Sequence, residues 1–248
     1  MIENIILDYG RVLAYPKTGN WFVPPNTQKI IGFNKYLRMF VHHDKTNLAF
    51  RKAYKKLNDN HLLHMEVEEL AQFTEFYKEI LERLDFQSDL DSIAELLAND
   101  NVLNDDKVIF YDDVIDELKK FNLSYRVAIL SDTWPSLKRV LDHNGVLQLT
   151  DGLIMSCDYG ICKDRLELFE IAVKELGINP ENSVFIDDST ANLKNAVIAG
   201  FKPILMDRTK KMRHCPYPVV HNLSEIAKVI QYYNSEGNKR STRRQRKA

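Results

Sequence analysis

The chain has 248 residues, of which 44% are hydrophobic and 28% charged. This composition is typical of a folded globular protein, and the length suffices for one large domain or for a core with a smaller second domain. No apolar run approaches the ~20 residues that a membrane-spanning helix requires, and the N-terminus lacks the basic start of a signal peptide. We therefore expect a cytoplasmic protein with no membrane partner.

The formal net charge of −1 hides a difference between the body of the chain and its end. Residues 239–248 carry six of the 34 Lys and Arg side chains and no acidic one, which leaves 28 basic against 35 acidic side chains in residues 1–238. An acidic body argues against nucleic acid as the main ligand. Residues 236–248 are too polar to bury a core, so we predict a basic, disordered tail with at most nonspecific contact to nucleic acid.

The first predicted element is a buried strand at residues 5–7, an unbroken apolar run that ends at Asp8. Residues 15–106 follow with no convincing strand and several helical stripes, of which residues 67–84 form the clearest. An insertion after the first strand lies at the carboxyl edge of a parallel sheet, where open α/β folds bind ligands. We therefore predict that residues 15–106 form a helical cap.

Strands and helices alternate after this insertion. Three further apolar runs predict buried strands at residues 127–130, 184–186 and 203–206. Amphipathic segments between them predict helices. The alternation predicts an α/β fold, in which residues 1–14 and 107–235 form a Rossmann-type core with a doubly wound parallel sheet.

Polar side chains lie just past the predicted strands, with a lysine ahead of a later helix. They are Asp8, Ser131 with Asp132, Asp187 with Asp188, and Lys163. Because the carboxyl ends of parallel strands meet at one edge, we expect these side chains to converge. Carboxylates repel one another unless a cation lies among them, and oxygen ligands favour Mg²⁺. Each cluster alone is also compatible with a helix cap or a strand end, so the prediction depends on their combination.

The order of these motifs resembles the haloacid dehalogenase superfamily. The similar segments are Ile5-Ile6-Leu7-Asp8-x-Gly10, Ile129-Leu130-Ser131, Gly160-x-x-Lys163 and Val184-Phe185-Ile186-Asp187-Asp188-x-x-x-Asn192. The helical insertion after the first motif resembles the helical-cap subgroup. Two details, Val12-Leu13 after the first motif and Thr133-Trp134 after the second, are similar to the branch with the phosphatase domain of soluble epoxide hydrolases and bacterial sugar-1-phosphate phosphatases.

The resemblance implies a magnesium-dependent phosphatase that acts on a small phosphorylated metabolite. Asp8 would attack phosphorus and form an aspartyl-phosphate, which water then hydrolyses. The Asp8 carboxylate, the Gly10 carbonyl and the Asp187–Asp188 pair would hold Mg²⁺, with Asp188 in direct contact.

The resemblance also implies roles for the remaining polar residues. Ser131 and Lys163 would bind phosphoryl oxygens and offset the growing negative charge. Asn192 would orient an acidic metal ligand from behind. Arg11 and Asp132 are further candidates for the phosphate side of the site.

Two departures from the family pattern bear on activity. Phosphatases of the family carry a second aspartate two residues after the nucleophile, which protonates the leaving group, and Gly10 takes that place here. General acid–base catalysis contributes about 10²–10⁴-fold, so we expect a preference for acidic leaving groups, as in anomeric sugar phosphates or acyl phosphates. Asp132 stands where the related branch has asparagine. Three possibilities stay open for its carboxylate. It is protonated, it is bound to a cation such as Arg11, or it acts in place of the missing second aspartate as the acid.

Two other functions stay open. Hydrolytic dehalogenation of a 2-haloacid uses the same fold without a metal, but the Asp187–Asp188 pair would then repel an anionic substrate. The changes at Gly10 and Asp132 are also compatible with a catalytically weakened binding or scaffold protein. The intact nucleophile, hydroxyl and lysine positions argue against that alternative.

Overall fold

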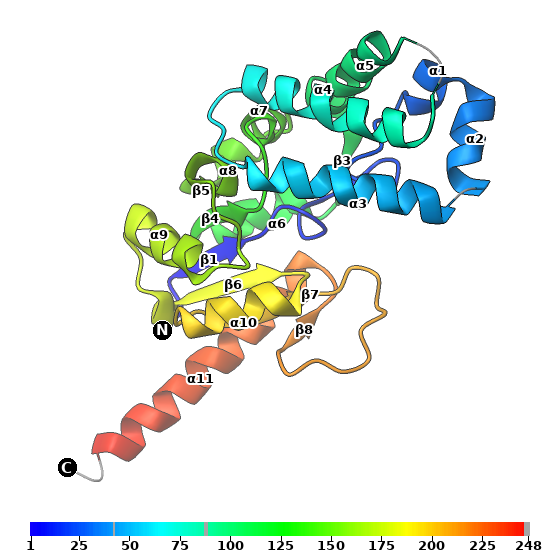
Figure 1. The fold of residues 1–248 in the computed structure, drawn as a ribbon. Helices are drawn as coiled ribbons and strands as arrows, with labels where there is room; N and C mark the ends of the chain where they lie inside the picture. Colours follow the sequence, from blue (N-terminus) through cyan, green and yellow to red (C-terminus); the bar gives the residue numbers. More distant parts are fainter. Residues whose placement is uncertain (42, 87–88, 246–248) are drawn as a thin grey trace.

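A parallel sheet of six strands, in the order β5-β4-β1-β6-β7-β8, lies at the centre of the computed structural model, which describes residues 1–41, 43–86 and 89–245 (Figure 1). The inner strand β1 pairs with β4 on one side and with β6 on the other, and all its residues are buried. The strands are β1 (Asn4–Leu7), β4 (Arg126–Ser131), β5 (Gly152–Met155), β6 (Ser183–Asp187), β7 (Lys202–Met206) and β8 (Val219–Val220).

Helices cover both faces of this sheet, because alternate residues of a strand point to opposite sides. Ile5 and Leu7 pack with apolar residues of α6, α7 and α11, whereas Ile6 packs with residues of α9 and α10. The helices of the core are α6 (Val114–Phe121), α7 (Ser136–His143), α8 (Ser156–Tyr159), α9 (Leu166–Leu176), α10 (Thr190–Ile198) and α11 (Ile226–Gln245). The predicted doubly wound α/β fold is confirmed.

The four strands predicted from apolar runs fall within β1, β4, β6 and β7. Strands β5 and β8 were not predicted. Strand β5 lies at the edge of the sheet, begins with Gly152 and buries only two of its four residues, so its apolar signal is weak. Strand β8 has only two residues. Short 3₁₀ helices lie at η1 (Asp105–Lys107), η2 (Leu147–Leu149), η3 (Pro180–Asn182) and η4 (Leu223–Glu225).

The insertion between β1 and the rest of the sheet is helical, and its helices lie together in Figure 1. They are α1 (Thr27–Ile31), α2 (Phe33–Val41), α3 (His43–Asp59), α4 (Glu66–Arg83) and α5 (Leu90–Val102). Their apolar faces form a cluster separate from the two clusters of the core. The chain enters and leaves the cap through a short antiparallel ribbon of two strands, β2 (Ala14–Pro16) and β3 (Val108–Phe110). The first residues of the predicted 15–106 cap therefore form a strand rather than a helix or loop.

The tail differs from its prediction up to Gln245. Helix α11 runs from Ile226 to Gln245 and extends away from the sheet in Figure 1, whereas residues 236–248 were expected to be disordered. Lys, Arg and Gln have high helix propensities, so a polar segment can continue a helix that Ile226 and Ile230 anchor in the core. Residues 246–248 lie outside the described residues. None of the described helices combines the length and apolarity needed to cross a bilayer.

The position of β1 in the core generates a stability prediction. Ile5 is fully buried, so Ile5→Ala should lower the free energy of unfolding by about 2–5 kcal/mol, measured by urea denaturation. Leu123, with 85% of its surface exposed, provides the control, because Leu123→Ala should change that free energy by less than about 0.5 kcal/mol. Equal effects of the two substitutions would contradict the central place of β1.

Candidate active site

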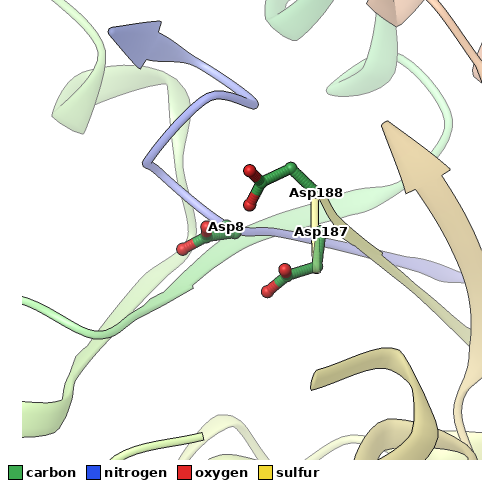
Figure 2. A group of neighbouring side chains, drawn as sticks. All are labelled: Asp8, Asp187 and Asp188. Carbon is green, nitrogen blue, oxygen red and sulfur yellow. The ribbon is translucent and has the colours of Figure 1, made fainter. Parts of the chain in front are cut away.

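The predicted catalytic carboxylates meet at the carboxyl ends of β1 and β6. Asp8 follows β1 and its N–H donates to the carbonyl of Ile186 at 2.9 Å, while Asp187 is the last residue of β6. Figure 2 shows the carboxylates of Asp8, Asp187 and Asp188 gathered in one region, and one oxygen of each lies within 4.8 Å of those of the other two. The convergence follows from topology, because β1 and β6 are parallel neighbours.

Lys163 supplies the positive charge of this cluster. Its Nζ lies 2.7 Å from Oδ1 of Asp8 and 2.7 Å from Oδ2 of Asp187, and only 2% of its side chain is exposed. Its backbone is held as well, because its N–H donates to Oδ1 of Asp132 at 2.8 Å and its carbonyl accepts from Nδ2 of Asn195 at 2.9 Å. The ammonium is therefore fixed between two carboxylates before a ligand enters.

Neighbouring groups hold Asp187 more firmly than Asp188. The N–H of Ser189 donates to Oδ1 of Asp187 at 2.7 Å, and Nδ2 of Asn192 lies 3.1 Å from its Oδ2. Asn192 thus contacts one of the acidic residues that it was predicted to orient. The half-buried Asp188 has a looser partner, with Nη1 of Arg11 at 3.7 Å from its Oδ2. The Asp188 carboxylate consequently keeps more free lone pairs for a cation.

Ser131 and Asp132 lie at the end of β4. The buried Ser131 is not among the residues that line the cavity described below, whereas Asp132 lines it. Arg11 pairs with Asp188, and no described ion pair joins it to Asp132, so the suggestion that Arg11 neutralises Asp132 is not supported. The N–H of Lys163 instead provides a partner for the Asp132 carboxylate.

Burial raises the pKa values of three carboxyl groups around this site. It raises the pKa of Asp8 to about 7, although Lys163 opposes the shift and Asp187 adds to it. Burial also raises the pKa values of Asp132 and Asp188. For Lys163, burial acts to lower the pKa, but Asp187 and Asp8 outweigh it and raise that pKa. The charge of one ammonium therefore does not balance the negative charge of the carboxylates, and a further cation would stabilise their ionised forms.

The donor set fits a hard divalent cation. Lys163 occupies Oδ1 of Asp8, which leaves Oδ2 available, and Asp188 offers a second carboxylate. Gly10, whose carbonyl is the predicted third ligand, lines the same cavity. Oxygen-only donors of this kind favour Mg²⁺. Asp8 and Asp188 would hold the ion directly, with Asp187 behind them.

Gly10 and Trp21 lie close together beside Asp8. A Cβ atom on Gly10 would lie 3.5 Å from Cζ2 of Trp21 and 3.9 Å from Oδ2 of Asp8. The indole also packs against Tyr9, with ring centroids 5.7 Å apart. An aromatic side chain therefore adjoins position 10, where the resemblance described above leads one to expect a second aspartate.

Asp8, Asp188 and Lys163 line a cavity of about 390 Å³ that extends under the cap. Aromatic side chains form much of its lining, namely Tyr9, Trp21, Phe22, Tyr54, Phe73 and Trp134. Tyr54, Phe73 and Lys107 could not be predicted from the sequence as lining residues, because their place in this cavity depends on how the cap packs on the core. A larger depression of about 1030 Å³ lies between α3 and α4, but its lining includes none of the three clustered carboxylates.

Solved structures with this fold are similar over nearly the whole chain. The 2-haloacid dehalogenase from Pseudomonas syringae pv. tomato DC3000 is 14% identical, with a TM-score of 0.65 over 94% of this chain and 100% of that one. The HAD-hydrolase YfnB from Bacillus subtilis, bound to magnesium, is 13% identical, with a TM-score of 0.65 over 92% and 98%. The enzyme bt-2542 from Bacteroides thetaiotaomicron, in complex with magnesium and inorganic phosphate, is 20% identical, with a TM-score of 0.59 over 86% and 98%.

Sequence comparisons agree with the structural ones. A segment of 58 residues is 36% identical to acyl-CoA dehydrogenase family member 10 from Mus musculus, and it spans 23% of this chain but only 5% of that protein. The model of the haloacid dehalogenase-like hydrolase family matches residues 30–200, which is more than half of the chain. The match covers most of the cap together with Ser131, Lys163 and the Asp187–Asp188 pair. The chain therefore belongs to the haloacid dehalogenase-like hydrolases.

Proposed function

We propose that this hydrolase is a Mg²⁺-dependent phosphatase of a small phosphorylated metabolite, with Asp8 as nucleophile. The observation that carries the proposal is the cluster of Asp8, Asp187 and Asp188 around a single buried ammonium, Lys163. Three carboxylates against Lys163 and the exposed Arg11 leave negative charge that a divalent cation would neutralise. Once bound, the ion would supply Lewis-acid stabilisation of the phosphoryl oxygens.

The side chains of the chain itself account for the two chemical steps. Lys163 holds Oδ1 of Asp8, so the carboxylate is oriented before substrate enters. An Asp8 oxygen attacks phosphorus, the bond from phosphorus to the leaving oxygen breaks, and an aspartyl-phosphate forms. Water then attacks the same phosphorus, which releases inorganic phosphate and restores the carboxylate. The Lys163 ammonium offsets the charge on the phosphoryl group in both steps.

The substitution of the second aspartate by Gly10 shapes the expected substrate. Glycine has no proton to donate, and Trp21 lies beside it. The leaving oxygen therefore departs without an acid from this position, which favours leaving groups of low pKa. We infer a preference for anomeric sugar phosphates or acyl phosphates over phosphates of primary alcohols.

Dehalogenation of a 2-haloacid is supported less well, although solved relatives include such an enzyme. That reaction places a substrate carboxylate near Asp8 without a cation, and the Asp187–Asp188 pair would repel it. The similarity to that 2-haloacid dehalogenase, at 14% sequence identity, supports a common fold and not a common reaction. A binding protein with weakened catalysis is favoured by one specific observation, the glycine at position 10 beside Trp21.

Removal of the nucleophile provides the first functional test. Wild-type protein should hydrolyse an activated aryl phosphate only with Mg²⁺, and Asp8→Asn should lower kcat by about 10³-fold or more because the attacking oxygen is lost. The exposed Asp116 supplies a matched control, since Asp116→Asn should leave kcat unchanged. Absence of metal-dependent turnover for any phosphate would support the binding-protein alternative instead.

The raised pKa of Asp8 predicts a pH dependence of metal binding. Only the ionised carboxylate binds a cation, and burial raises the pKa of Asp8 to about 7. The affinity for Mg²⁺ should therefore be highest above pH ~7 and fall by about tenfold per pH unit below it. Titration calorimetry between about pH 5.5 and about 8 measures this slope, and Asp8→Asn should flatten it. An affinity independent of pH in wild-type protein would contradict the prediction.

The contact between Gly10 and Trp21 predicts how leaving groups are discriminated. Wild-type enzyme should favour aryl over primary-alkyl phosphates, measured as the ratio of their kcat/KM values. The double variant Gly10→Asp/Trp21→Ala restores an acid and the space beside it, so it should raise turnover of alkyl phosphates by up to about 10²-fold and that of aryl phosphates far less. Equal turnover of both classes by wild-type enzyme would contradict this account.

A further inference from the structure

The catalytic cavity is larger than a phosphate requires. Its volume is about 390 Å³, whereas a phosphate group has only five heavy atoms. The volume also falls within the range of small-molecule pockets. The leaving group of the substrate therefore has room inside the cavity, and the side chains remote from Asp8 can select it.

Lys107 lines this cavity where the chain returns from the cap to the core. It is the last residue of η1, directly before β3, and its side chain is half-buried. Its Nζ donates to the carbonyl of Asn101 and to Oγ of Ser136, the latter at 3.3 Å. The lysine thus stands in the same cavity as the nucleophile but on a different segment of the fold.

A hydrogen-bond relay between cap and core fixes the direction of this lysine. Glu69 on α4 of the cap accepts from the N–H of Ser136 at 2.7 Å and from its Oγ at 2.8 Å. Because the Ser136 hydroxyl donates its proton to Glu69, its lone pair faces Lys107 and accepts from the ammonium. Both Glu69 and Ser136 are buried, so the relay forms only when the cap is docked on the core.

The Lys107 ammonium has fewer hydrogen-bond acceptors than N–H donors among the described residues. An ammonium has three N–H donors, and among the residues that the structure describes two of them have acceptors. No described carboxylate lies within salt-bridge distance of Lys107, and Glu69 acts on it only at longer range. Burial accordingly lowers the pKa of Lys107, with Glu69 opposing the shift. Lys107 lines the cavity, and its third N–H has no acceptor among the described residues, so it suits an acceptor from a ligand.

We propose that Lys107 is a specificity-determining residue, which donates a hydrogen bond to an acceptor oxygen on the leaving group, at the end remote from the phosphate. The natural substrate is then a phosphate ester with a hydroxyl or carboxylate oxygen at that end, lying against aromatic side chains such as Trp21 and Trp134. This inference rests on the proposed phosphatase function. Lys107 contacts no reacting atom, so its effect falls on recognition of the leaving group.

Three aryl phosphates of matched size test the proposal. These probes are 4-carboxyphenyl, 4-(hydroxymethyl)phenyl and 4-methylphenyl phosphate, of which the third lacks the distal oxygen. The measured quantity is discrimination, the kcat/KM for an oxygen-bearing probe divided by that for the methyl probe. Lys107→Met should lower discrimination about ten- to a hundredfold for at least one oxygen-bearing probe, because a charge-assisted hydrogen bond is lost. The probe affected distinguishes a carboxylate from a hydroxyl.

Two further variants separate recognition from folding. Lys107→Arg keeps the charge and should retain most of the discrimination, whereas Lys119→Met, which removes an exposed lysine of α6, should leave discrimination unchanged. An equal loss on all three probes for Lys107→Met, or no change in discrimination, would overturn the proposal. Failure of wild-type protein to hydrolyse any probe with Mg²⁺ would overturn the proposed function instead.

Discussion

The site depends on the ion pairs that the Lys163 ammonium forms with Asp8 and Asp187. The ammonium lies 2.7 Å from both Asp8 and Asp187 in a region where almost no solvent reaches it. Without it, the desolvated carboxylates at the ends of β1 and β6 would repel one another and take up protons. With it, their repulsion is reduced but not removed, since burial still raises the pKa of Asp8 to about 7. The remaining repulsion between the carboxylates favours the binding of a second cation, which the proposed reaction requires.

The core and the cap contribute different side chains around the carboxylate cluster. The core holds the carboxylates of the proposed reaction at strand ends, where parallel pairing of β1 with β6 brings them together. The cap adds part of the aromatic lining and supplies Glu69, which hydrogen-bonds Ser136 of the core helix α7 and thereby directs Lys107. Trp21, from the loop before the cap helices, lies close to Gly10, and we propose that this arrangement restricts the leaving group. In this proposal the residues that select the leaving group come from both the core and the cap.

The convergence of Asp8, Lys163 and Asp187 could be predicted from sequence, because the ends of buried parallel strands have one common location. The fold class could also be predicted, from the alternation of strands and helices, and the cap from the helical stripes that interrupt this alternation. Lys107 could not be predicted, since nothing in its local sequence indicates that it faces the cavity; that depends on how α4 and α5 pack against the core. Helix α11 was missed because composition alone does not show that a polar segment continues a helix begun in the core.

The central claim is that Asp8 becomes phosphorylated, and mass spectrometry tests it most directly. Wild-type protein incubated with Mg²⁺ and excess acetyl phosphate, then quenched in acid, should gain the mass of one phosphoryl group. Peptide mapping should locate that group on Asp8, and hydroxylamine should remove it, as expected of an acyl phosphate. A covalent phosphate on another residue, or turnover without any trapped phosphate on Asp8, would contradict the account.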